Sequence, residues 1–303
     1  MHASLQDSRP APRKVALVLA IGVCSISTGA ILVRMADCAP LTKAAWRCAL
    51  AAIILGVSGG ARRPSTAPQG RVIGLALMAG ALLAFHFGTW IASLDSTSVA
   101  RSSLLVATTP IWVAMASPFV TTDRPTWRAL LGVAISLAGS AWIALDDPGG
   151  GETKGALLAL AGALGAAGYV LVGRRVGSRI PIQRYLFLCY GSAALWLIIA
   201  ARANGDALFG FDGKTWAALI GLAMVPQLLG HSACNWALRW LPALLVSVVF
   251  LAEPIVASIL AWLFLQETPG LVVLLAAPLI LAGIVLAADA RTNPPPSDEQ
   301  PAV

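Results

Sequence analysis

Three polar side chains that can hydrogen-bond a solute follow one another at intervals of four residues in an otherwise apolar stretch. They are Gln227, His231 and Asn235. Residues four apart lie on one slowly turning face of an α-helix, so these side chains are predicted to share a face. In an apolar environment such a face lines an aqueous cavity, or it joins neighbouring helices by hydrogen bonds worth about 0.6 kcal/mol each. We favour the cavity, in which the three groups would contact a substrate.

A second polar face carries an imidazole and an indole. His86 is followed four residues later by Trp90. His86 lies eight residues before Leu94, and His231 lies seven residues before Leu238. If the two stretches cross a membrane in opposite directions, both imidazoles lie at similar depths. A single intramembrane histidine is usually a packing residue, whereas two at matched depths favour a common cavity.

An acidic residue and a proline stand together in the middle of another apolar stretch, as Glu253 and Pro254. The corresponding stretch in the first half of the chain has Thr109 and Pro110. Each proline removes an intrahelical hydrogen bond, so both helices are predicted to bend there and to provide hinges. Glu253 either satisfies backbone groups that the bend frees, or exchanges a coupling proton in its apolar surroundings. Both interpretations stay open.

Arg47 is a candidate ligand for a substrate carboxylate. It lies about 7 Å inside the predicted outer end of its helix, so the side chain could instead extend outward to the membrane interface. No salt bridge to Glu253 is assumed, because that carboxylate lies deeper. Trp90, Trp112 and Tyr169 would give a cavity an aromatic wall suited to flat or amphipathic solutes, although packing explains each of them separately.

These candidate residues lie in ten apolar stretches, most about 20 residues long, the length that a helix needs to cross a ~30 Å hydrocarbon core. The predicted spans are residues 15–33, 42–59, 72–94, 102–121, 127–145, 155–172, 185–201, 215–240, 243–265 and 271–289. Apolar residues make up 58% of the chain and charged residues 12%, against roughly 25% charged in soluble domains. Continuous apolar runs favour helices over barrel strands, so we predict an all-α integral membrane protein with ten transmembrane helices.

The basic residues predict how the chain is oriented. With the N-terminus inside, the outer side keeps only seven of the 21 Lys and Arg residues: Arg34, Lys43, Arg47, Arg101, Lys154, Arg202 and Lys214. The positive-inside rule then places both termini in the cytoplasm. Because the basic residues lie in short loops and form no patch on a soluble domain, the net charge of +7 does not indicate a nucleic-acid partner.

The two halves of the chain repeat each other. A shift of 140 residues pairs Lys14, Gly22 and Arg34 with Lys154, Gly162 and Arg174. A shift of 144 residues pairs Leu94, Ser103, Pro110, Pro125 and Gly139 with Leu238, Ser247, Pro254, Pro269 and Gly283, and sets Asp123 on Glu267. Five spans per half is an odd number, so the second half is predicted to be inverted relative to the first. Carriers with inverted repeats bind substrate between the repeats, near the membrane midplane.

The predicted organisation has two repeats, a linker and two tails. The first repeat is 13–145 and the second 154–290, joined by the acidic, glycine-rich linker 146–153. Residues 1–12 and 291–303 are rich in proline and polar residues, and we expect disordered cytoplasmic tails.

The chain resembles the EamA-like branch of the drug/metabolite transporter superfamily over nearly its whole length. The matching residues are Arg34, the segments 40–47, 94–110 and 250–267, Gly139 and Gly283. The resemblance implies a ten-helix, exporter-like carrier of the bacterial inner membrane, with a cavity formed mainly by the third, fourth, eighth and ninth spans. Members of this family carry amino acids, other metabolites or toxic compounds.

Motifs for other functions are missing from the sequence. There is no GxxxxGK[ST] nucleotide loop and no HExxH motif, so we expect neither an ATPase nor an enzyme. The sequence predicts a secondary active transporter that exports small metabolites, such as amino acids or related amphipathic compounds, by alternating access. Uptake or exchange on the same scaffold is the alternative. The expected partners are a small-molecule substrate, the lipid bilayer and, if Glu253 carries the coupling ion, protons; no cofactor or metal is expected, and the oligomeric state is left open.

Overall fold

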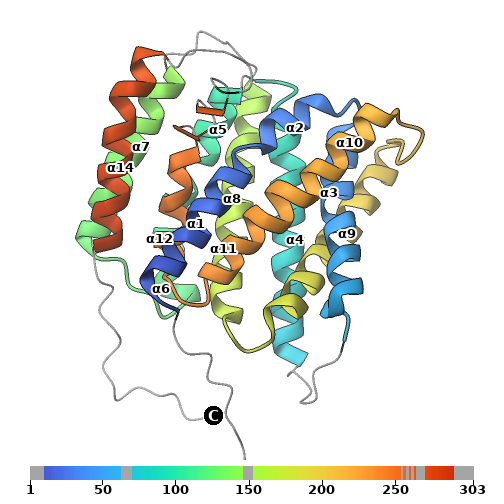
Figure 1. Ribbon diagram of the computed structural model, residues 1–303, viewed down its shortest axis with the longest axis horizontal. Coiled ribbons are helices and arrows are strands. Elements are labelled where there is room, and N and C mark those ends of the chain that lie inside the picture. The colour runs from blue at the N-terminus through green and yellow to red at the C-terminus, as the bar shows by residue number, and fades with distance from the viewer. Residues whose placement is uncertain are drawn as a thin grey trace, which may run out of the picture.

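Helices make up the ordered elements of the computed structural model (Figure 1), and no strand occurs in the residues it describes. Those residues are 10–62, 70–97, 99–145, 153–253 and 270–289, together with positions 255, 256, 259, 260 and 263. The prediction of an all-α fold is therefore confirmed over the described part of the chain.

The helices follow one another in two series. The first half contains α1 (Pro12–Ile26), α2 (Gly29–Met35), α3 (Pro40–Leu55), η1 (Gly56–Gly60), α4 (Gly70–Ser93), α5 (Val99–Val106), α6 (Thr109–Val120) and α7 (Trp127–Leu145). The second half contains α8 (Thr153–Val176), α9 (Ile182–Ala203), α10 (Gly213–Leu222), η2 (Ala223–His231), α11 (Ser232–Ala237), α12 (Ala243–Val249), η3 (Phe250–Ala252) and α14 (Leu271–Asp289).

Eight helical stretches in the described residues are long and apolar enough to cross a membrane, which confirms a multi-pass membrane protein. Two of the ten predicted spans are not among the eight. The described apolar segments of these two are shorter, Trp127–Ile143 and Ala243–Ala252. The arrangement of ten membrane-spanning helices therefore stays a prediction.

Small residues bring helices of the two halves close together. A Cβ added at Gly132 of α7 would lie 2.5 Å from the Gly283 carbonyl oxygen of α14, and one added at Gly139 would lie 3.2 Å from the Ala276 oxygen. As residue numbers rise along α7, those of its contacts on α14 fall, so the two helices are antiparallel. Close approach through small residues is how helices associate in membranes, where lipid is as apolar as the helix surface.

The same kind of contact joins α4 to α8 and α1 to the η2–α11 segment. A Cβ at Gly162 would lie 3.3 Å from Thr89 Oγ1, and one at Gly22 would lie 3.1 Å from the Ala233 Cβ. Gly22 and Gly162 are paired by the 140-residue shift, and Thr89 and Ala233 by the 144-residue shift. Contacts between the halves therefore recur in matched pairs.

Four of the predicted spans are interrupted near their middle. The first breaks between α1 and α2, where Ser27 Oγ donates to the Val23 carbonyl and Thr28 Oγ1 to that of Ser25. Such bonds from side chain to preceding carbonyl compete with helix continuation. The eighth span passes through the π-helical η2 around Pro226, and the described part of the ninth passes through the 3₁₀ turn η3.

The fourth span differs from the prediction in one respect. Pro110 was expected to bend a continuous helix, but it occupies the first turn of a new helix, α6, and α5 ends four residues earlier. A proline is favourable in a first turn, because its missing N–H would have no intrahelical acceptor there. Pro254, its predicted counterpart, lies outside the described residues.

Candidate functional site

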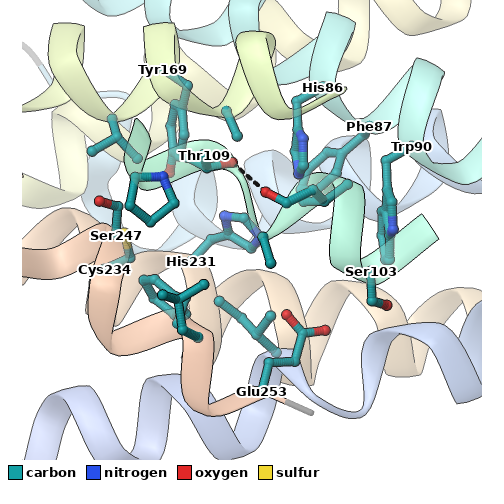
Figure 2. Close-up of a pocket in the computed structure, with 18 of the residues that line it drawn as sticks. His86, Phe87, Trp90, Ser103, Thr109, Tyr169, His231, Cys234, Ser247 and Glu253 are labelled. Atoms are coloured by element: carbon teal, nitrogen blue, oxygen red, sulfur yellow. Dashed lines mark hydrogen bonds between the residues drawn. The ribbon is translucent and has the colours of Figure 1, made fainter. Parts of the chain in front are cut away.

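A cavity with a volume of about 120 Å³ lies among the interrupted helices (Figure 2). Its walls come from α1, α3, α4, α8, the α5–α6 span, the η2–α11 span and the α12–η3 span. Seven of the predicted site residues line it: Arg47, His86, Trp90, Pro110, Tyr169, His231 and Glu253. The fold thus collects residues that lie more than 200 positions apart in sequence.

Arg47 is held deep in the protein and does not extend to the membrane interface. Its side chain is 1% exposed, and its guanidinium carbon lies 4.0 Å from the ring centroid of Phe87. Its Nε donates a hydrogen bond to Gln227 Oε1 at 2.7 Å. A cation–π contact together with a charge-assisted hydrogen bond offsets part of the cost of burying the charge. Among the described residues this Nε bond is the hydrogen bond that Arg47 makes, which leaves further N–H groups of the guanidinium for an anionic group in the cavity.

The histidines enter the cavity from opposite sides. His86 Nδ1 lies 2.9 Å from the Gly162 carbonyl oxygen; a carbonyl can only accept, so Nδ1 donates. The His86 ring lies parallel to that of Trp90, with an interplanar angle of 4°. His231 packs its ring edge-on against Phe87 at 5.1 Å, and no partner for its Nδ1 is found in the described part of the chain. Figure 2 shows His231 projecting into the space below His86 and Phe87.

Gln227 and Asn235 lie behind the cavity wall, although the four-residue spacing predicts one face shared with His231. Gln227 is fully buried against Arg47. Asn235 Nδ2 donates to the Tyr169 hydroxyl and, at 2.8 Å, to the His231 carbonyl oxygen. Both amides therefore position cavity residues through hydrogen bonds, and only His231 of the three reaches the cavity itself.

The predicted face divides around the π-helical segment η2, because its two amides form hydrogen bonds to different helices. Pro226 lies inside this segment, which ends at His231. Gln227 Oε1 accepts from Arg47 on α3, whereas Asn235 Nδ2 donates to Tyr169 on α8. Gln227 consequently faces α3 and Asn235 faces α8, with His231 between them.

Glu253 directs its carboxylate into the cavity from the end of η3 (Figure 2), and its backbone carbonyl accepts a hydrogen bond from Ser27 Oγ at 3.4 Å. Within the described residues, the only ion pair at salt-bridge distance joins Arg174 and Asp123, so Glu253 and Arg47 share the cavity without direct contact. Thr109, the counterpart of Glu253 in the first half, also lines the cavity and donates to the Val106 carbonyl at 2.7 Å.

Trp112 is not among the residues that line the cavity. Its indole Nε1 donates to Thr108 Oγ1 at 3.2 Å, across the break between α5 and α6. It supports the α6 end of the break and contributes no ring to the aromatic wall, which is formed by Phe87, Trp90 and Tyr169.

The sequence patterns did not identify several cavity residues: Phe87, Ser103, Thr109, Cys234, Ser247 and Phe250. A signal for two of them was present, because Ser103 and Ser247 are identical residues paired by the 144-residue shift. Phe87 and His231 are paired by the same shift. No group of three metal-binding side chains comes together in the described residues.

Comparison with known proteins assigns this fold and cavity to a family. The sequence profile of the EamA-like transporter family matches residues 13–145 and, separately, residues 153–288. A crystal structure of one protein aligns with a TM-score of 0.74 at 19% identity, over 91% of this chain and 97% of that one. At this identity the likeness shows a shared fold alone.

Two relatives carry transporter names. An uncharacterized transporter of Archaeoglobus fulgidus is 26% identical over 225 residues, or 73% of this chain and 77% of the relative. A probable terminal-alkyne amino-acid exporter of Streptantibioticus cattleyicolor is 25% identical over 192 residues, or 61% of this chain and 62% of the exporter. The match thus spans less than two thirds of the exporter's length. These relatives indicate a transporter and not an enzyme, and with the family profile matching both halves, the chain belongs to the EamA-like transporter family.

Proposed function

We propose that this chain is a secondary active transporter that exports small amphipathic metabolites, of the size and polarity of amino acids, by alternating access. The cavity is the substrate site. The observation that carries the proposal is the pairing of a buried cation, Arg47, and a carboxylate, Glu253, in one aromatic cavity without direct contact between them. A substrate carboxylate bound at Arg47 would supply the counter-charge that this buried guanidinium lacks among the described residues.

The inverted arrangement of two five-helix repeats, 13–145 and 154–290, is part of the proposal. The family profile matches the chain twice, in nearly these ranges. The antiparallel packing of α7 on α14 also supports inversion. Gly132 and Ala276 are equivalent by the 144-residue shift, as are Gly139 and Gly283, and each glycine of α7 contacts the equivalent of the other.

Two further contacts support a two-fold axis perpendicular to the helices. Phe87 and His231 are equivalent by the same shift, and their rings pack against each other. Ser136 and Ile280 are also equivalent, and Ser136 Oγ donates to the Ile280 carbonyl at 3.0 Å. Residues that contact their own equivalents lie on the axis that relates the repeats. These contacts support an axis that passes beside the cavity, as expected of a carrier that alternates between two related states.

Energy coupling by Glu253 belongs to the same proposal. A carboxylate with no ion-pair partner within salt-bridge distance in the described residues, facing a cavity inside the membrane, is suited to taking up and releasing a proton. Export with proton entry would then use the gradient across a bacterial inner membrane. Both termini are proposed to lie in the cytoplasm, on the basis of the loop charges.

Metabolite measurements in cells test direction and substrate. We expect overexpression to lower the intracellular content of the substrate and to rescue growth in the presence of toxic amino-acid analogues. Loss of growth on a sole nutrient after deletion, without such rescue, would replace export by uptake on the same scaffold. An Arg47→Gln variant, expressed at the same level, provides the control for binding in the cavity.

A further inference from the structure

A carboxylate from the first half of the chain is held by two segments of the second half, and a third segment holds the arginine that binds it. Asp123, which follows α6, receives hydrogen bonds from Arg174 Nη2 at 3.0 Å and from Arg174 Nε at 3.1 Å. Its Oδ2 also accepts from the Ala243 backbone N–H at 3.0 Å. Arg174 Nη1 in turn donates to the Leu238 carbonyl at 3.0 Å. We refer to Asp123, Arg174, Leu238 and Ala243 as the Asp123 cluster.

The Asp123 cluster is more than a surface ion pair. The Asp123 side chain is 7% exposed, and the guanidinium meets it through two nitrogens. Bidentate pairs in partly desolvated surroundings are the strong class of charge-assisted hydrogen bonds, whereas exposed pairs contribute little. The cluster therefore fixes the loop after α6 against the end of α8, the end of α11 and the start of α12.

The cluster lies directly beyond one end of the cavity. Arg174 follows the cavity residue Tyr169 by five residues on α8, a rise of about 7.5 Å, and Ala243 precedes Ser247 by four residues on α12, about 6 Å. Because α1 runs antiparallel to the η2–α11 segment, this is the end of the bundle at which α1 begins, the lower end in Figure 1.

We propose that the Asp123 cluster is the gate that closes the cavity toward the side of the protein on which α1 begins. Opening to that side requires the first-half loop to separate from α8 and α12, and these hydrogen bonds must then break. The inference rests on the proposed alternating access and adds the residues that control one of its two states. By the repeat register Asp123 corresponds to Glu267 and Arg174 to Arg34; Glu267 lies outside the described residues, and the proposal uses neither.

Thiol labelling of a reporter cysteine tests the gate without a known substrate. Ser247→Cys, in a chain whose five native cysteines are replaced, places a thiol in the cavity wall next to the cluster. An impermeant maleimide is applied to inside-out and to right-side-out vesicles, so both ends of the cavity are probed. With Asp123→Asn added, we expect labelling from the α1 side to be about tenfold faster and labelling from the other side to be slower, because the population shifts to one state.

Two comparisons separate a gate from a general structural role. Asp95→Asn, the same change at an exposed residue beyond α4, should alter neither rate. Arg174→Gln should reproduce the effect of Asp123→Asn and Arg174→Lys should show a smaller one, which preserves the test if Asp123→Asn does not fold. Faster labelling from both sides would indicate a loosened fold and overturn the gate, as would unchanged rates.

The same labelling distinguishes failure of the gate from failure of the proposed function. Labelling of Ser247→Cys from both sides in the background with Asp123 and Arg174 intact supports alternating access independently. If that holds and Asp123→Asn changes nothing, only the gate is wrong. A reporter that reacts from neither side in any variant would overturn alternating access through this cavity, and the gate with it.

Discussion

Arg47 Nε donates a 2.7 Å hydrogen bond to Oε1 of Gln227, a residue 180 positions later in the chain, and both side chains are buried. The bond aims the guanidinium across the face of Phe87 and into the cavity. Gln227, in the second half of the chain, thereby positions the charge of Arg47, in the first half.

Replacing Gln227 by leucine tests this relationship. The change keeps the volume but removes the acceptor, so the buried guanidinium loses its hydrogen bond, which costs about 1.5–3 kcal/mol. We expect a lower melting temperature in detergent and weaker substrate binding. Gln183→Leu on the exposed side of α9 is the matched control and should change stability by less than about 0.5 kcal/mol. Equal effects of the two substitutions would show that the hydrogen bond does not position Arg47.

Cysteine accessibility should differ among the three polar residues of the eighth span. In a cysteine-free background we expect His231→Cys to react with membrane-impermeant thiol reagents, because its side chain lines the cavity. Gln227→Cys and Asn235→Cys should stay protected, since their side chains face α3 and α8. Equal reaction at all three positions would instead support the prediction from the four-residue spacing, in which all three side chains face the cavity.

Glu253→Gln should separate driven transport from exchange. Glutamine keeps the shape of the side chain but cannot ionise, so pH-driven accumulation in vesicles should be lost. Exchange of substrate down its own gradient should persist, because it needs no net proton movement. Full pH-driven transport by the variant would leave Glu253 a local role at the helix break and direct attention to His86 or His231 as the titrating group.

Pro110→Ala should slow every transport mode. Alanine permits α5 and α6 to join into one continuous helix. The segment beside the cavity would then no longer favour the broken conformation. Rates of driven transport and of exchange, measured with the same vesicles, should fall together. Pro118→Ala, near the end of α6 and away from the cavity lining, is the control. A selective loss of driven transport would argue against a hinge.

The proposed topology places the C-terminus in the cytoplasm. A reporter fused after Val303 that is active only in the cytoplasm should be active, and one that requires export should be silent. The reverse pattern would overturn the orientation inferred from the positive-inside rule, and would exchange the two sides in the labelling experiment without changing its design.

The sequence by itself determined the class of protein. Runs of apolar residues about 20 long decide in favour of membrane-spanning helices, because backbone groups in lipid must bond within their own segment. The 144-residue shift between the halves also pairs Ser103 with Ser247, and both serines line the cavity. The sequence also identifies ionisable residues within these apolar runs as candidate site residues, because a charged group in a bilayer is energetically costly. They are Arg47, His86, His231 and Glu253.

Only the tertiary structure decided which polar side chains face the cavity and which hold others in place. Helical periodicity predicts one face for Gln227, His231 and Asn235, but Gln227 bonds to Arg47 and Asn235 to Tyr169, so only His231 reaches the cavity. The sequence did not predict the Asp123 cluster either. Asp123 and Arg174 are 51 residues apart in different halves, and a local pattern carries no information on which distant helices pack together. Local hydrophobicity sets each helix, whereas side-chain packing between helices determines what meets across them.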